Sequence, residues 1–466
     1  MSRKGLLIKR FVGEGLIGNL AETLSVRPSC HGRWILICLS IILVVFRQES
    51  YLVSPRFWAE EGVVFFSFAR THGVIEAFLQ PHLGYYSLLP NLASILAARV
   101  VSLENAPLVT TLVALGVQCL PLCLVVFGRG PYWQGLIRKT VVVAIIFLAP
   151  LSYEVWLNTI NSQFYLCLFT LLLLLEPPPA VAGRFSSWSL RLSLCLAGLT
   201  GVLSCLLVPL YWLRALIEKK REVVVWALIL SACTLVQLAV VVKSGSAKVD
   251  AGVITAMGLK LPVRSVHIDP PTLGSILMVK NGLLNFFGLS SSASMAKMIH
   301  GWYVKAGIEH QLFGYGSLIL LASLMLGLSR RIPGAARYLL PGGFVSLVVP
   351  STALALVSDL GVLIGPYAAH RYYFVPNVLV LLMVTCAIDW ENPKRLVKPL
   401  NMACLFLLCM AVFGGVRDFR NFQGVKGQVY DVSWPRWKEE IARWRKDSSY
   451  PVKLWPAPQW QMTIDP

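Results

Sequence analysis

Apolar runs alternate with short polar and basic stretches along almost the whole chain. The first run, WILICLSIILVVF, covers residues 34–46, and further runs recur up to residue 413. About 20 consecutive apolar residues cross the hydrocarbon core of a bilayer as a helix, and backbone amides cannot stay unpaired in lipid. The pattern therefore predicts an all-α, polytopic membrane protein with about ten to twelve transmembrane helices.

Most of the expected spans follow residue 139, where apolar runs and loops alternate regularly. They lie near residues 140–152, 164–175, 223–242, 311–328, 338–357, 373–388 and 399–413. The run at 192–213 starts and ends at basic loops, which suggests two short helices folded about Gly198–Gly201.

The runs at 85–103 and 107–127 conflict with the charge pattern. If both cross the membrane, the basic stretch 129–139 falls on the outer side, against the positive-inside rule. We therefore expect one of the two runs not to cross fully, and the sequence leaves open which one.

Two loops between the spans contain apolar segments of their own. In the first outer loop, 47–84, the stretch VVFFSFARTHGVIEAFL predicts one or two amphipathic helices at the membrane interface. In the large outer loop, 243–310, the stretch LGSILMVKNGLLNFF (273–287) is short and interrupted, so we expect an interfacial helix rather than a span.

The C-terminal segment, 417–466, has a different composition, with five tryptophans and many charges, and we expect it to be extracytoplasmic. Ser433 can cap a helix that has Pro435 in its first turn. Trp437, Ile441 and Trp444 would then share one face. This face either packs as a small lid against the outer loops or offers tryptophans for stacking on sugars.

Composition supports the membrane interpretation. Of the 466 residues, 56% are hydrophobic and only 14% are charged, whereas soluble domains have about 25% charged residues. The net charge of +19 comes from basic clusters between apolar runs, such as SRRIPGAAR, which indicates membrane topology rather than nucleic-acid binding. Residues 1–33 are then a cytoplasmic segment, and residues 34–416 form the transmembrane domain.

The 11 cysteines lie almost all in apolar runs without a CxxC motif, so we expect neither disulfides nor a zinc site.

Acidic residues are scarce, yet two stand side by side after the first span. Glu60 and Glu61 occur in SPRFWAEEGVVFFSFA, residues 54–69, among aromatic side chains. Carboxylates in apolar surroundings cost free energy, so they are candidates for function. Adjacent helical residues point about 100° apart, so at most one faces a given pocket, and we favour Glu60. The alternative is the solvated start of an interfacial helix.

Several features together resemble the GT-C superfamily of integral membrane glycosyltransferases. They are an acid just past the first span, the interfacial segment after it, the stretch PHLGYYSLLPNLA (81–93) and the stretch HRYYFVPNVLVLLMV (370–384), which is similar to an Arg-Tyr-x-x-Pro motif of bacterial members. Members of the superfamily use polyprenyl-phosphate-linked sugars as donors. The resemblance implies a GT-C-like fold in a bacterial-type inner membrane, with the active site on the periplasmic side.

The resemblance also implies roles for individual residues. An outer-loop carboxylate, Glu60 or Glu61, would act as general base on the acceptor in a single inverting step. Cationic groups would bind the departing phosphate, since guanidinium is a bidentate partner for phosphate; the candidates are Arg371, His370 and Arg56. The candidate substrate-binding residues are His82, Tyr85, Asn158, Asn161, Gln163 and Tyr372. For Arg371, snorkelling to lipid headgroups is the alternative; for His82 and Tyr85 it is interfacial anchoring, and for the amides it is turn formation.

The expected partners are a polyprenyl-phosphate-linked sugar, membrane lipids and a glycan, lipid or protein acceptor, without nucleic acid. No cofactor is expected. A divalent ion held by Asp269 and Asp359 with Glu60 is conceivable by analogy with oligosaccharyltransferases, but no metal-ligand spacing supports it. The alternative functions are a lipid-linked sugar flippase or transporter and a polysaccharide polymerase or ligase. Transporters are commonly built from repeated halves, and the sequence shows no internal repeat.

Overall fold

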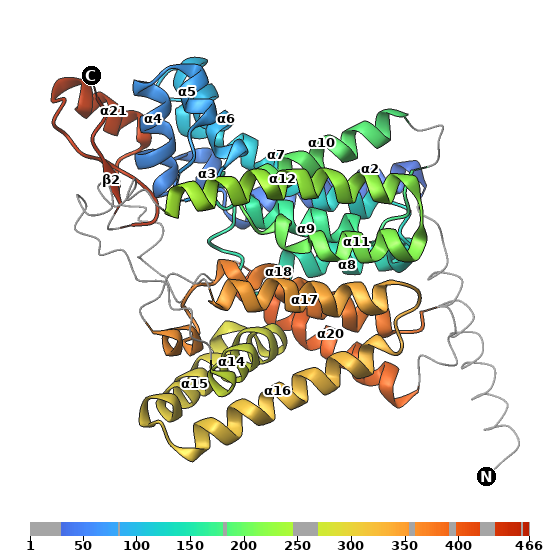
Figure 1. The fold of residues 1–466 in the computed structure, drawn as a ribbon. Coiled ribbons are helices and arrows are strands. Elements are labelled where there is room, and N and C mark those ends of the chain that lie inside the picture. Colours follow the sequence, from blue (N-terminus) through green and yellow to red (C-terminus); the bar gives the residue numbers. More distant parts are fainter. Residues whose placement is uncertain are drawn as a thin grey trace, which may run out of the picture.

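The computed structural model describes residues 29–82, 84–179, 184–245, 269–353, 359–390, 398–419, 434–457 and 460–465 (Figure 1). Helices dominate this part of the chain. Its only strands are β1 (Val452–Lys453) and β2 (Gln461–Met462), which pair antiparallel. The cytoplasmic segment expected at 1–33 lies almost entirely outside the described residues.

Within the described ranges, six helices are long and apolar enough to cross a membrane. They are α2 (Cys30–Arg47), α7 (Ala106–Phe127), α12 (Arg221–Gly245), the stretch Pro270–Lys305, which is kinked at Gly288, α16 (Ile308–Ser329) and α20 (Pro399–Asp418). Shorter apolar helices accompany them: α6 (Leu88–Arg99), α9 (Ser162–Leu173) and α18 (Arg371–Ala387). The other helices of the bundle are α8 (Leu136–Leu148), α10 (Arg184–Leu199), α11 (Val208–Glu218) and α17 (Ala336–Ala353). The described part of the chain is thus almost entirely helical and multi-pass, and the larger number of about ten to twelve spans stays a prediction.

The helices form two groups that meet at α8, α9, α18 and α20. Figure 1 shows α2 and α7–α12 in one group and α14–α17 in the other. Helix α9 contacts α7 on one side and α18 on the other, while α20 contacts α8. Helix α9 is hydrophobic all round and almost entirely buried, as expected of a helix at the centre of a bundle.

Helix lengths and backbone angles bear on two of the uncertain runs. Helix α6 has 12 residues, about 18 Å of helix at 1.5 Å per residue, which is shorter than the roughly 30 Å of a bilayer core. Helix α6 is therefore too short to cross by itself, and which of the two runs does not cross fully stays a prediction. The run at 192–213 is two helices, as predicted: α10 and α11 are separated by Gly201, at φ +81°, and the short helix η3 (Ser204–Leu207).

The stretch 273–287 is helical, as predicted, but it lies in the bundle, and its interfacial position stays a prediction. This stretch runs through α14 (Pro270–Leu277), the π-helical turn η4 (Met278–Leu283) and the start of α15 (Leu284–Lys305). Ile276 and Val279 are fully buried. Helix α14 packs closely against α16 at Gly274. A side chain at this position would collide with the Gly314 carbonyl of α16, so glycine permits the close approach. Only residues 246–268 of the expected large outer loop lie outside the described chain.

The first loop folds into a series of short helices, in keeping with its predicted helical character. They are α3 (Ser50–Val53), η1 (Glu61–Phe66), α4 (Ser67–Thr71) and α5 (Val74–Leu79). Helix α21 (Trp437–Lys446) of the C-terminal segment lies beside α4 in Figure 1. The other short elements are η2 (Pro131–Trp133) and η5 (Leu360–Ile364).

The predicted apolar face of the C-terminal helix is confirmed. Trp437, Ile441 and Trp444 are all buried, in one cluster with Phe57 and Phe66 of the first loop. The segment therefore packs as a lid on that loop, and these two tryptophans are not available for stacking on a sugar. Helix α21 starts at Trp437, after the N-cap Arg436, and the predicted cap Ser433 lies outside the described residues.

Candidate active site

The two adjacent glutamates have different surroundings. Glu61 is 2% exposed, and its carboxylate accepts hydrogen bonds from the backbone N of Trp58 (3.1 Å), from the backbone N of Thr159 (2.9 Å) and from the Thr159 hydroxyl. Burial raises the pKa of Glu61, and the hydrogen bonds from Thr159 and Trp58 oppose that shift. Glu61 thus fastens the first loop to the segment that precedes α9.

Glu60 is only half-buried. Its carboxylate lies within electrostatic range of the Arg371 guanidinium and the Tyr85 hydroxyl. It precedes η1, next to Ala59, whose φ of +41° turns the backbone sharply at this point. The fully bonded Glu61 therefore holds the turn, while Glu60 keeps a carboxylate that a ligand can reach.

Arg371 is the first residue of α18, and its side chain is 33% exposed. One terminal nitrogen lies 3.9 Å from a carboxylate oxygen of Glu154, and the guanidinium carbon lies 5.4 Å from the centre of the Tyr372 ring. An ion pair of this length is weak. The guanidinium thus retains donors for an anionic ligand.

Other predicted residues line the space around Glu60 and Arg371. The Gln163 side-chain amide donates a hydrogen bond to the Tyr85 hydroxyl (3.3 Å), and Tyr85 interacts electrostatically with Tyr372, Arg371 and Glu60. Gly201 leaves room for the Gln163 amide, since a side chain there would meet it at 2.2 Å. The structure thus brings together residues from the first loop, the segment between it and α6, α9 and α18: Glu60, Tyr85, Gln163, Arg371 and Tyr372.

Arg56 contacts the C-terminal segment rather than the residues around Glu60. It is 2% exposed, donates to the carbonyl oxygens of Lys453 (2.7 Å) and Pro435, and pairs with Glu440 at 3.4 Å. A phosphate would have to displace these partners. The sequence-based assignment of Arg56 to phosphate is therefore corrected: it joins the first loop to the C-terminal segment.

His370 also differs from its predicted role. It is fully buried, and its Nε2 faces the Pro366 carbonyl. Burial, with Lys280 nearby, holds the pKa of His370 well below its ordinary value. The ring is therefore neutral and is not a cationic ligand for phosphate.

The two predicted asparagine ligands shape the loop between α8 and α9. The side-chain amides of Asn158 and Asn161 both donate to the Glu154 carbonyl, at 2.8 and 2.9 Å, and the Asn158 oxygen accepts from the backbone N of Asn161. Both residues are buried. Turn formation, rather than contact with a sugar, accounts for them, and they hold Glu154 in place.

His82 packs against aromatic rings of the first loop. Its ring centre lies 4.7 Å from that of Phe65 and 5.2 Å from that of Phe68, and the side chain is 4% exposed. This burial makes His82 a packing residue beside the site.

The two acids considered for a metal ion act as helix caps. Asp269 accepts from the backbone N of Thr272, and Asp359 accepts from the backbone N of Gly361 and from the Tyr303 hydroxyl. Within the described part of the chain, no group of three or more His, Cys, Asp or Glu side chains could hold a metal ion.

Two residues that shape the site were not selected from the sequence. Glu154 pairs with Arg371, and its place in the aromatic stretch SYEVWLN was a signal that could have identified it. Lys280, fully buried, donates to the carbonyl oxygens of Gly365 and Ala368, both at 2.7 Å. It thereby fixes the loop that leads to Arg371. No sequence signal identifies Lys280, because its stretch reads as interfacial.

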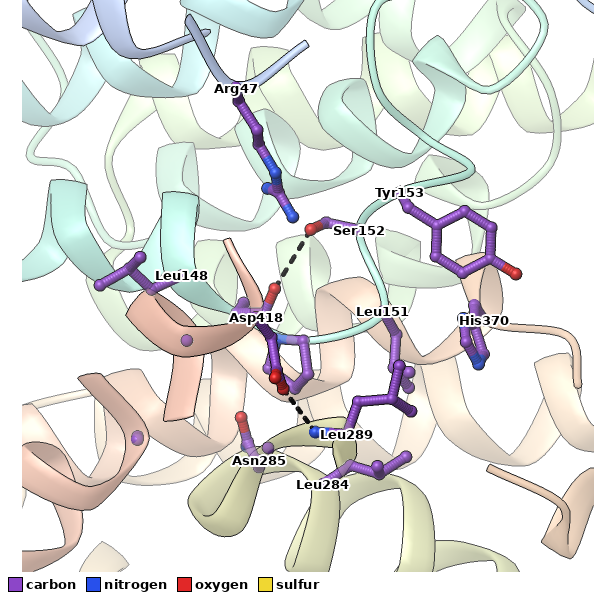
Figure 2. Close-up of a pocket in the computed structure, with 15 residues that line it drawn as sticks. Arg47, Leu148, Leu151, Ser152, Tyr153, Leu284, Asn285, Leu289, His370 and Asp418 are labelled. Carbon is purple, nitrogen blue, oxygen red and sulfur yellow. Dashed lines mark hydrogen bonds between the residues drawn. The ribbon is translucent and has the colours of Figure 1, made fainter. Parts of the chain in front are cut away.

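A pocket lies behind this site, where the loop 149–153 meets α15 and the end of α20. Figure 2 shows Tyr153, Asn285, His370 and Asp418 around it. The Tyr153 ring contacts His370 edge-on, with ring centres 4.7 Å apart, and the Tyr153 hydroxyl donates to Glu154 (3.0 Å). Tyr153 thus contacts both His370, which lines the pocket, and Glu154 of the Arg371–Glu154 pair.

No known protein-family model matches this chain, and no curated protein matches it either.

Proposed function

We propose that this protein is a membrane glycosyltransferase of the GT-C type. It would move a hexosyl or pentosyl group from a polyprenyl-phosphate donor to a glycan, lipid or protein acceptor of the cell envelope, on the outer face of a bacterial-type inner membrane. The observation that supports this proposal is the electrostatic interaction of the half-buried Glu60 carboxylate with the partly exposed Arg371 guanidinium. A proton acceptor and a phosphate-binding cation in one site are what the reaction needs.

In the proposed reaction, the Glu60 carboxylate takes the proton of an acceptor hydroxyl or amine. The freed electron pair attacks the anomeric carbon of the donor sugar, and the bond from that carbon to the phosphate oxygen breaks. Polyprenyl phosphate leaves with the bonding electrons, and its new negative charge is stabilised by Arg371. Attack opposite the leaving group inverts the configuration at the anomeric carbon.

The neighbouring residues support these roles. Glu61 and its bonds to Trp58 and Thr159 fix the turn that carries Glu60, and preorganisation of a base in this way contributes to catalysis. Tyr85 and Gln163 offer hydroxyl and amide groups next to Glu60, suited to sugar or acceptor hydroxyls.

The test uses membranes from cells that lack this protein and express either the wild type or a variant. We expect Glu60→Gln to reduce transfer of radiolabelled sugar from polyprenyl phosphate into envelope glycans by about 100-fold or more, since a general base contributes roughly 10²–10⁴-fold. Glu76→Gln, at an exposed acid of α5, is the matched control and should keep wild-type transfer. Full transfer by Glu60→Gln would rule out Glu60 as the base.

A further inference from the structure

The side chain of Gln237, in helix α12, bonds the backbone next to Tyr85. Gln237 is 1% exposed, and its Oε1 accepts from the backbone N of Tyr86 at 3.0 Å. Its Nε2 donates to the Tyr86 carbonyl oxygen at 2.9 Å and to the Gly198 carbonyl oxygen of α10 at 3.2 Å. One partner is a donor and the other two are acceptors, so only one orientation of the amide satisfies all three hydrogen bonds. The amide therefore holds both polar backbone groups of Tyr86.

The turn that follows α10 holds the same backbone segment. The Tyr86 carbonyl oxygen also accepts from the backbone N of Gly201 at 3.1 Å, and Ser87 forms an isolated antiparallel β-bridge with Thr200. A residue paired in an antiparallel sheet exchanges N–H and C=O bonds with its partner. The Gln237 amide makes the same two bonds to Tyr86, so it acts here as a substitute for a strand.

Glycine allows α12 to approach closely enough for this contact. A side chain at Gly198 would meet the Cβ atom of Cys233, one turn before Gln237 on α12, at 2.6 Å. Buried backbone groups need hydrogen-bond partners, so a purely structural task is the simpler account of Gln237. The position of the contact, directly after Tyr85, indicates a second task.

Tyr85 brings a hydroxyl to the space around the proposed base and cation. The Gln163 amide nitrogen donates to the Tyr85 hydroxyl oxygen at 3.3 Å, so the hydroxyl hydrogen remains for another acceptor. Tyr85 interacts electrostatically with Arg371 and Glu60. A hydrogen-bond donor thus lies next to the two groups that the proposed reaction uses, and its place depends on the backbone that Gln237 holds.

We infer that Gln237 is a positioning residue: through the backbone of Tyr86 it places the Tyr85 hydroxyl to donate a hydrogen bond to an oxygen of the substrate. The inference rests on the proposed transferase function and adds to it a residue that does not itself touch the substrate. Displacement of a group in a preorganised site lowers kcat even when the altered residue is distant from the reacting atoms.

A double-mutant cycle tests whether Gln237 acts through Tyr85. The variants are Tyr85→Phe, which removes only the hydroxyl, Gln237→Met, which keeps the length of the side chain but not the amide, and the two combined. We expect each single variant to lower kcat for sugar transfer about tenfold, the size of one hydrogen bond to a charged group. The double variant should be slower than Tyr85→Phe by no more than about twofold, whereas independent effects would multiply to about 100-fold.

Hydrogen–deuterium exchange of the full chain in nanodiscs tests the contact without any sugar donor. The Tyr86 amide loses its acceptor in Gln237→Met, so exchange in the peptide that contains Tyr86 should become about tenfold faster. The matched control is Thr234→Val. Thr234 lies one turn earlier on α12, and its hydroxyl donates within the helix, to the Leu230 carbonyl oxygen at 2.8 Å. This variant should keep wild-type exchange and wild-type transfer.

The outcomes separate this inference from the proposed function. Wild-type transfer by Gln237→Met or by Tyr85→Phe, or multiplied losses in the double variant, would overturn the positioning role. The same losses in Thr234→Val would overturn it as well, because the effect would then belong to the helix rather than to the amide. Unchanged exchange in Gln237→Met would overturn the contact itself, whatever the activity.

Absence of transfer by the wild type would instead overturn the proposed function together with the role of Tyr85, while faster exchange in Gln237→Met would still establish the hold on Tyr86. If Gln237→Met does not accumulate in membranes, Gln237→Asn, whose side chain is one methylene shorter, takes its place in both experiments.

Discussion

Two arginine–glutamate pairs of this protein differ in how completely their charges are satisfied. Arg56 and Glu440 are 1% and 0% exposed, and the guanidinium also donates to backbone carbonyls. Arg371 and Glu154 are 33% and 20% exposed and lie 3.9 Å apart. The first pair is buried and joins distant parts of the chain. In the second pair, the Arg371 guanidinium keeps hydrogen-bond donors for a ligand. Burial and completed hydrogen bonds, rather than residue type, distinguish a structural cation from one that can bind substrate.

The largest expected effect concerns the buried pair of Arg56 and Glu440. Arg56→Ala leaves Glu440 buried without its partner, and removal of one member of a buried pair costs roughly 3–5 kcal/mol of unfolding free energy. Unfolding in mixed micelles, followed by fluorescence, measures this cost. The control is Arg445→Ala. Arg445 also belongs to α21, and its ion pair with Glu104 is more exposed, so this variant should lose less than about 1 kcal/mol of unfolding free energy. Equal costs for both variants would contradict the comparison.

For the pair of Arg371 and Glu154 we expect a change in donor binding instead. Arg371→Ala removes charge-assisted hydrogen bonds to phosphate, each contributing about 1.5–3 kcal/mol, so the KM for the polyprenyl-phosphate donor should rise about 10- to 100-fold. Stability should change by less than about 1 kcal/mol, because the pair with Glu154 is partly exposed and its atoms lie 3.9 Å apart. An unchanged donor KM would remove Arg371 from the phosphate site.

Glu154→Gln tests whether the ion pair competes with the phosphate. The variant keeps the side-chain shape but frees the Arg371 guanidinium, so donor affinity should rise, by up to about fivefold for an exposed pair. Direct binding of the donor lipid to purified protein measures this. A loss of donor affinity would show that Glu154 itself takes part in binding.

The smallest effect concerns Glu61 and pH. Burial raises its pKa in the fold above the ordinary 4.5, so the folded protein holds this proton more tightly than the unfolded chain. The stability due to Glu61 is therefore present below about pH 4.5 and is lost as pH rises through the higher folded pKa. Glu61→Gln cannot ionise, so its Tm should fall less than that of the wild type between acidic and neutral pH. Parallel Tm curves for the two proteins would argue against a raised pKa.

The sequence predicted the features that depend on local pattern. Helix formation, the break at Gly201 and the buried face with Trp437 and Ile441 all follow from periodicity and glycine placement. That Glu60 and Arg371 act on one substrate stays a prediction.

What the sequence could not supply depends on long-range partners. Arg56 looked like a free cation because Glu440 lies 384 residues later. Asn158 and Asn161 looked like sugar ligands because their carbonyl partner, at Glu154, is set by how the loop folds. The 273–287 stretch looked interfacial because its apolar run is short, and only the Gly274–Gly314 contact shows how it enters the bundle.

The backbone contact between the first loop and the C-terminal segment has a consequence for biosynthesis. The backbone N of Trp455 donates to the Phe57 carbonyl at 3.0 Å, and the backbone N of Ala59 donates to the Trp455 carbonyl. The turn before Glu60 therefore stays incomplete until the ribosome has released almost 400 further residues, since a chain emerges from its N-terminal side. A nascent or prematurely terminated product therefore lacks the last partner of its acidic turn.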